Sequence, residues 1–138
     1  MNRIVPVGLA IIAVLLVFGG RLLAQQAREP YLPLARVEII TTEPELNELV
    51  SELTAFAGQK DLTVRRGDFP KQGRWVLNLG LYFQTDSFFI IDNFIQSDRL
   101  TLVAYSHEAE RTWRMTWHDL IARITSKVGS DRVLVVTP

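Results

Sequence analysis

The stretch WVLNLGLYFQTDSFFIIDNFIQSDRLTLVAYSH, residues 75–107, decides the fold, because it predicts three strands joined by two short turns. Large apolar residues recur at every second position over 75–83, and runs rich in aromatic and β-branched residues follow over 87–96 and 99–107. The connections of three and two residues leave room only for tight turns. We therefore expect an antiparallel meander of three neighbouring strands.

The first of these strands has one strongly apolar face. Its alternate residues are Trp75, Leu77, Leu79, Leu81 and Phe83. The residues between them are Val76, Asn78, Gly80 and Tyr82. This pattern indicates a sheet that is covered mainly on one side.

An amphipathic helix precedes the meander. Thr42 can cap its start, Glu45 can complete a capping box, and Pro44 falls in the first turn, where proline is tolerated. Gly58 supplies a stop signal. Between them, apolar residues recur at helical spacing: Leu46, Leu49, Val50, Leu53, Phe56 and Ala57.

A second amphipathic helix follows the meander and ends at Gly129. Just before it, Trp113, Met115 and Trp117 alternate with polar residues, which predicts a short extra strand. The apolar stripe of the helix is made of Trp117, Leu120, Ile121, Ile124 and Val128.

Three further strands are expected, over 34–41, 62–66 and 132–137, and residues 67–73 are expected to be a loop. The order is then β-α-β-β-β-(β)-α-β. It predicts an α+β domain in which two amphipathic helices pack on a mainly antiparallel sheet. This order resembles that of the ferredoxin-like fold, a split βαβ unit, with an extended central hairpin. The resemblance concerns element order alone, and it implies no function.

The N-terminus carries an uncharged apolar run, IVPVGLAIIAVLLVFGG at residues 4–20, between Arg3 and Arg21. As a helix this run spans roughly 26 Å, just short of the ~30 Å hydrocarbon core of a bilayer. A single-pass membrane anchor is feasible if residues 22–24 extend the span and Arg21 reaches the headgroups.

A cleaved signal peptide is the alternative, with cleavage after Ala24. Leu22 at the −3 position and Arg21 inside the cleavage region argue against it. Both readings stay open. They place the protein either in an inner membrane with its domain in the periplasm, or free in the periplasm.

In both readings the chain divides at the same places. Residues 1–24 form the transmembrane or signal helix, and residues 25–33, with two prolines, form a linker. Residues 34–138 form the extracytoplasmic domain.

Composition excludes several functional classes. Without Arg3 and Arg21 the chain carries 13 basic and 15 acidic residues, so it has little electrostatic attraction for nucleic acid. It has no cysteine, which rules out disulfides, thiolate catalysis and cysteine-bound metals. We expect no cofactor, no bound metal and no nucleic-acid partner.

Groups that could perform catalysis are sparse. His107 and His118 belong to no metal-binding spacing, and Ser106 and His107 are neighbours on a strand and therefore point to opposite faces. A carboxylate-dependent hydrolase remains the alternative from the enzyme class. Its candidate groups are Asp92, Glu108, Glu110 and Asp119.

The strand at 87–96 is the best candidate for a binding site, because it has aromatic residues on both faces and a polar Asp-Asn pair in its middle. Either this strand lies in a two-sided core, or one of its faces is an exposed patch that binds a protein. The candidate partner-binding residues are Tyr82, Phe88, Phe89, Asp92, Asn93 and Phe94.

The sequence thus predicts a non-enzymatic protein of a bacterial envelope whose domain binds another protein. Two roles are open: an accessory subunit of a membrane complex, or a soluble inhibitor or toxin-neutralising protein. Besides the hydrolase, the remaining alternative is a carrier of an apolar ligand or lipid, held between helices and sheet.

Overall fold

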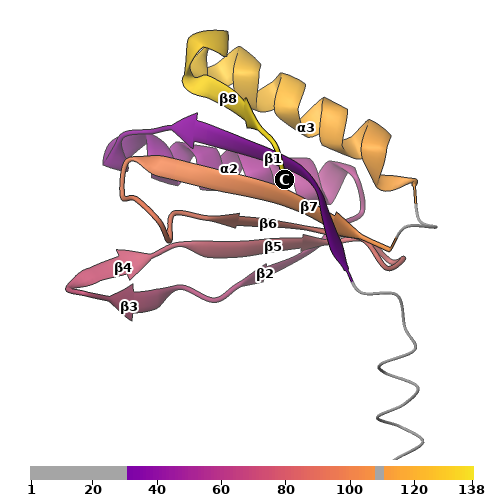
Figure 1. Cartoon of the computed structure of the whole chain (residues 1–138), viewed down its shortest axis with the longest axis horizontal. Helices are drawn as coiled ribbons and strands as arrows, with labels where there is room; N and C mark the ends of the chain where they lie inside the picture. Colours follow the sequence, from indigo (N-terminus) through magenta and orange to yellow (C-terminus); the bar gives the residue numbers. More distant parts are fainter. Residues whose placement is uncertain (1–30, 108–110) are drawn as a thin grey trace, which may run out of the picture. The chain divides into compact units, whose positions relative to one another are not determined.

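The computed structural model describes residues 31–107 and 111–138. Its main sheet has the strand order β2-β5-β6-β7-β1-β8, and all neighbouring strands are antiparallel (Figure 1). The strands are β1 (Leu32–Ile40), β2 (Thr63–Arg66), β5 (Asn78–Tyr82), β6 (Phe88–Asp92), β7 (Arg99–Ser106) and β8 (Val133–Val136). The predicted meander is therefore confirmed as β5-β6-β7.

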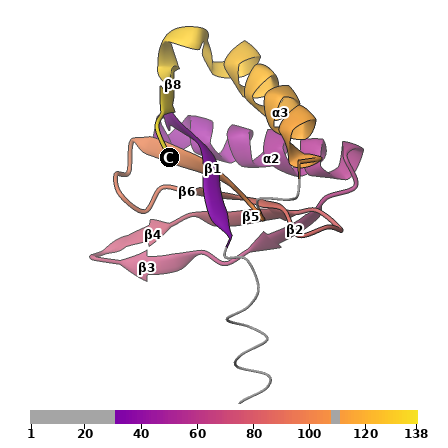
Figure 2. The ribbon, with the colours of Figure 1, turned by 45° about the vertical axis from the view of Figure 1, so that its right-hand side comes forward.

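Two helices, α2 (Glu43–Gln59) and α3 (Trp113–Val128), lie on the same face of the sheet (Figures 1 and 2). A short 3-10 turn, η1 (Ser130–Arg132), leads from α3 into β8. The prediction of an α+β domain with a mainly antiparallel sheet and two helices is confirmed. The membrane or signal helix expected at 1–24 lies outside the described residues, and within them no helix is long and apolar enough to cross a bilayer.

Each helix connects two strands that are parallel to each other but not adjacent. Helix α2 leads from β1 to β2, which lies at the far edge of the sheet. Helix α3 leads from β7 to β8, and β1 lies between those two strands. The first strand is thus held in the sheet by two strands from the C-terminal half of the chain.

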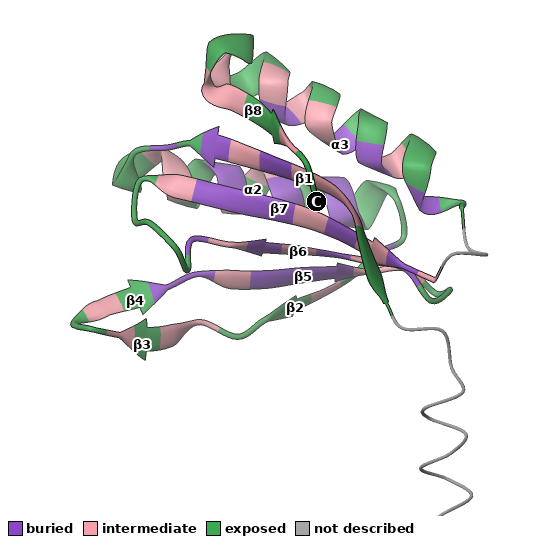
Figure 3. Ribbon diagram, in the orientation of Figure 1, coloured by how far each residue is buried: buried purple, intermediate pink, exposed green. Residues whose placement is uncertain are grey.

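The hydrophobic core lies between the helices and the inner face of the sheet, and Figure 3 shows the buried positions along the central strands. Phe89 is fully buried there, and its ring packs edge-on against Phe83 and Trp117 with centroid distances of 5.2 and 5.1 Å. The helices supply Leu49, Leu53, Phe56, Trp113, Trp117, Leu120 and Ile124.

The short strand predicted around Trp113 to Trp117 is wrong, because α3 begins at Trp113. Trp113 and Trp117 are buried, as residues four apart on one helical face should be. Met115 shares their face only on a strand, and it is 78% exposed. The spacing of the two tryptophans fits both a strand and a helix, and the exposure of Met115 between them agrees with the helix alone.

The strand predicted over 75–83 is interrupted at Leu77, and the loop predicted before it contains a strand. β3 (Phe69–Lys71) and β4 (Arg74–Val76) form a separate hairpin whose turn, Gln72-Gly73, has positive φ at both residues. Such a two-residue turn matches the right-handed twist of a hairpin. Trp75 therefore does not join the inner apolar face but is 71% exposed.

The ends of α2 also differ from expectation. The helix begins after Thr42 as predicted, but the Thr42 hydroxyl makes no capping bond, and Glu45 turns to Arg132 instead. The helix runs past Gly58 to Gln59, and Asp61 supplies the left-handed residue beyond it. β1 begins at Leu32, so it takes in the last two residues of the predicted linker.

Replacing Phe89 with alanine should lower the free energy of unfolding by about 3–5 kcal/mol, because it empties a fully buried site. Phe88→Ala is the matched control, since Phe88 is half-buried on the opposite face of the same strand. Urea denaturation of the full chain measures both losses. A loss at Phe89 no larger than that at Phe88 would contradict the assignment of Phe89 to the core.

A candidate protein-binding surface on the open sheet face

The outer face of the sheet, opposite the helices, is covered by no helix of the described chain (Figure 2). Three aromatic rings cross it side by side from β5, β6 and β7. The ring of Phe88 stacks on Tyr82 at 5.4 Å and on Tyr105 at 5.1 Å between centroids. The strand register causes this, because Tyr82 pairs with Phe88 and Phe88 pairs with Tyr105. We call these three residues the aromatic row.

Further side chains pack against the aromatic row. The guanidinium of Arg65, on β2, lies 5.1 Å from the ring centroid of Tyr82, a cation–π arrangement. Tyr31, just before β1, packs edge-on against Phe88 in the middle of the row at 4.9 Å and lies 4.3 Å from the ring of His107. Through Tyr31 and Arg65, the aromatic row is in contact with the start of β1 and with the edge strand β2.

Gly80 leaves room for the ring of Tyr82. A Cβ atom at this position would lie 2.4 Å from Cε2 of Tyr82, much closer than real contacts allow. The absence of a side chain at Gly80 lets the Tyr82 ring lean back over the backbone of its own strand. A side chain at Gly80 would displace the Tyr82 ring and disturb one end of the aromatic row.

Beside the aromatic row, the outer face becomes aliphatic and then charged. Ile90 and Val103 are paired neighbours and only partly buried. Further along, Glu38 bridges two arginines, with its oxygens 3.1 Å from Arg36 and 3.0 Å from Arg99. An apolar centre with a charged rim is the common anatomy of a protein-binding surface.

The Asp92-Asn93 pair shapes the end of β6. The side-chain oxygen of Asn93 accepts a hydrogen bond of 2.8 Å from the N–H of Leu77, and Asn93 is only 5% exposed. The carboxylate of Asp92 accepts the N–H of Phe94 at 3.0 Å, which turns the chain away from the sheet. β6 therefore ends at Asp92 instead of continuing to residue 96.

Phe94 lies apart from the aromatic row, beside the β3–β4 hairpin. Its ring is 3.5 Å from Nζ of Lys71, and its carbonyl oxygen accepts a hydrogen bond of 2.8 Å from Arg74. Phe69 lies 6.0 Å away between ring centroids. These contacts hold the hairpin against the end of β6, and Phe94 is still 44% exposed.

The six residues predicted from the sequence thus occupy three places. Tyr82 and Phe88 meet in the aromatic row, and Asp92 is on the same outer face of the sheet. Phe89 and Asn93 face inward and are buried, and Phe94 belongs to the hairpin contact. Sequence reasoning missed Tyr105, Tyr31 and Arg65. Alternation along 99–107 could have placed Tyr105 on the outer face, but only the register shows what it stacks against.

The candidate catalytic groups that belong to the described residues lie in separate places. His107 is largely buried, and its Nε2 lies 3.9 Å from a carboxylate oxygen of Asp86. His118 is exposed on α3, and Asp119 forms an ion pair of 2.8 Å with Lys60. Glu108 and Glu110 lie outside the described residues. Among the residues that the structure does describe, no three metal-binding side chains gather.

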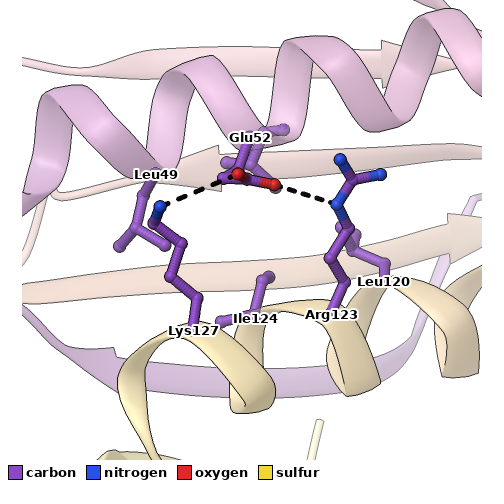
Figure 4. A pocket seen from close by; sticks show the side chains of 7 residues that line it. Leu49, Glu52, Leu120, Arg123, Ile124 and Lys127 are labelled. Carbon is purple, nitrogen blue, oxygen red and sulfur yellow. Dashed lines mark hydrogen bonds and ion pairs between the residues drawn. The ribbon is translucent and has the colours of Figure 1, made fainter.

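The space between α2 and α3 is nearly filled. A gap of about 10 Å³ lies beside Glu52, whose carboxylate points between Arg123 and Lys127 (Figure 4). That volume is about enough for one water molecule and far too small for a lipid chain. A shallower cleft of about 340 Å³ lies at the surface, lined by Glu45, Glu48, Leu49, Lys127, Val128 and Arg132.

Ion pairs lower the pKa values of three carboxyl groups. The hydrogen bond from Arg132 lowers the pKa of Glu45, and the one from Arg123 lowers that of Glu52, where Lys127 adds to the effect. The hydrogen bond from Arg66 lowers the pKa of Asp68, with help from the backbone N–H of Asn78. A lowered pKa keeps these groups ionised, which suits ion pairing and not the donation of a proton.

The Asn93→Ala variant should lose about 1–3 kcal/mol of unfolding free energy, since the N–H of Leu77 would stay buried without its acceptor. Asn47→Ala, on the exposed surface of α2, is the matched control and should cost far less. Thermal or urea unfolding compares the two. Equal stability of the Asn93 variant and the parent would refute a structural role for this side chain.

The lowered pKa values also predict acid sensitivity. The pKa values of Glu45 and Glu52 are lower in the folded protein than the ordinary value of 4.5. Their ion pairs therefore stabilise the fold at pH values above 4.5. This stabilisation disappears as the pH falls through the lower folded values. We expect the urea midpoint to drop as the pH falls below the ordinary value of 4.5.

Glu52→Gln should flatten that pH dependence, because it removes one titrating partner of Arg123. Glu43→Gln, an exposed change in the first turn of the same helix, should leave the slope unchanged. The two slopes, measured side by side, decide the matter: identical slopes would show that the Glu52 pair does not contribute.

Comparison of the chain with protein-family models, with curated proteins and with solved structures finds no match in any of the three.

Proposed function

We propose that this is a non-enzymatic protein of a bacterial envelope and that its α+β domain binds another protein through the outer face of the sheet. The observation that carries the proposal is the aromatic row of Tyr82, Phe88 and Tyr105, which no helix of the described residues covers. An aromatic surface that a fold leaves accessible costs solvation free energy, which binding a partner recovers.

The physical properties of the aromatic row suit a binding surface. Tyrosine and phenylalanine rings bury a large area with little loss of side-chain entropy, and stacking holds these rings in place before a partner arrives. The tyrosine hydroxyls can take part in hydrogen bonds at the edge of an interface. The charges of the Arg36–Glu38–Arg99 cluster would select the orientation in which a partner protein binds.

We infer that the N-terminal apolar run directs this domain out of the cytoplasm, into the periplasm. An anchor retained in the inner membrane would favour the accessory subunit of a membrane complex. Cleavage after Ala24 would favour a soluble inhibitor. The strand order β8-β1-β7 at one side of the sheet and β2 at the other supports the split βαβ arrangement with an extended central meander.

Two observations weigh against the rival functions. Of the candidate carboxyl groups of a hydrolase, Asp92 is engaged in a turn and Asp119 in an ion pair with Lys60, so both are poorly placed for acid catalysis. Glu108 and Glu110 lie outside the described residues. The narrow gap between the helices gives a lipid or another apolar ligand little room. Binding by the outer face needs neither a cavity nor a proton donor.

Photo-crosslinking tests the proposal. A benzoylphenylalanine in place of Tyr105 in the full chain should form one discrete adduct with a different protein when illuminated in the native envelope. The same group in place of Met115, which is 78% exposed on the helix side, is the matched control and should not form that adduct. Adding Phe88→Ser to the protein that carries benzoylphenylalanine at position 105 should reduce the yield of the adduct several-fold. Equal adduct patterns from positions 105 and 115 would refute binding by the outer face.

A further inference from the structure

The two edges of the main sheet are protected differently. The edge strand β2, with the sequence TVRR, carries Arg65 on one face and Arg66 on the other, and both are exposed. The edge strand at the opposite side of the sheet, β8, has the sequence VLVV and no charge. Val135 on this strand is 85% exposed and Leu134 is 36% exposed.

This difference matters because an edge strand presents unpaired N–H and C=O groups that another strand can bind. Proteins commonly prevent such pairing with charged side chains at the edge, as β2 does. β8 has no such protection within the described chain, and its most exposed residue, Val135, is apolar and β-branched. The free side of β8 is thus the place on the sheet where another strand can pair at the least cost.

We propose that β8 pairs antiparallel with β8 of a second copy of this chain, so that two sheets join around a two-fold axis. Such pairing is isologous: the same edge serves both subunits, and the assembly closes at two copies. Pairing of β8 with β2 of another copy would instead continue without end, and Arg65 and Arg66 oppose it.

Charge favours a second copy as the occupant. The charged residues nearest to β8 in sequence are Asp131 and Arg132, which precede it. Arg132 is held away from the free edge by Glu45 and by the carbonyl oxygen of Ile40 at 2.9 Å. Two β8 edges can therefore meet without opposing like charges, whereas two β2 edges would bring arginines against arginines.

The alternation of strand faces restricts the register. Residues directly opposite each other must lie on the same face of the joined sheet. The two-fold axis must therefore pass between a residue and the same residue of the second copy, not between two successive residues. Centring on Val135 pairs the most exposed side chain with itself. It also places Leu134 opposite Val136 of the partner subunit and leaves the charged turn before β8 beyond the paired region.

The contact is short, so we expect weak self-association. β8 has four residues, and pairing over such a length buries less than the ~1,200 Å² typical of stable complexes. Its population should therefore rise with protein concentration. The outer face of the sheet stays free in this dimer, so failure of the self-pairing would leave the proposed function intact, and the reverse holds as well.

Disulfide trapping in the full chain is a sharp test, because the protein has no cysteine of its own. Directly opposed strand residues have Cα atoms about 4.5–5.5 Å apart, within reach of a disulfide. Val135→Cys should therefore give a disulfide-linked dimer on mild oxidation. Met115→Cys on α3 and Thr63→Cys on β2, both exposed, are the matched controls and should give several-fold less.

A second change separates strand pairing from random collision. Leu134→Lys in the Val135→Cys background should reduce the trapped dimer several-fold, because it places a charge on the edge. Thr63→Lys in the same background should leave the yield unchanged. The proposal is overturned if Val135→Cys yields no more dimer than the controls, if Leu134→Lys has no effect, or if position 135 links only to a different protein.

Discussion

The packing of both helices on one face of the sheet is the constraint on which the rest of the structure depends. Phe89 and its neighbours on the inner face meet Trp117 of α3, and α2 adds Leu49, Leu53 and Phe56 to the same core. Since alternate residues of a strand point to opposite faces, each buried residue on β6 commits a neighbour to the outer face. The aromatic row is therefore a direct consequence of where the helices lie.

Charged residues reinforce this arrangement at its margins. Glu52 on α2 reaches both Arg123 and Lys127 on α3, and Arg132 ties the turn before β8 to the start of α2. These contacts lie at the surface, where ion pairs add little to stability, so they orient the helices more than they hold them. The main stabilisation comes from the apolar residues between helices and sheet.

The sequence predicted the α+β class, the meander and both helices because their periodicities are long and regular. It predicted a short strand near Trp113, where α3 begins, because two tryptophans four residues apart share one face in a strand and in a helix alike. It also missed β3, where Pro70 argued against a strand although an edge hairpin tolerates proline. The buried role of Asn93 depends on a bond to Leu77, which is distant in the sequence and became visible only with the register.

The candidate site shows the same limit. Alternation within β6 separated Phe88 from Phe89, but it could not say which of the two faces the helices would cover. The sequence identified Tyr82 and Phe88 as candidates, yet the third ring, Tyr105, comes from a different strand and joins them only through pairing. Single residues were within reach of sequence reasoning, and their assembly across three strands was not.

The position of β1 has a consequence for how the chain folds. This strand is made first, yet both of its neighbours, β7 and β8, belong to the last third of the chain. Pairings between such distant segments carry a large loop-closure entropy and slow folding. The meander β5-β6-β7 can form locally, but the sheet cannot close until the C-terminus has been synthesised. A chain cut short before β8 would leave one side of its first strand unpaired.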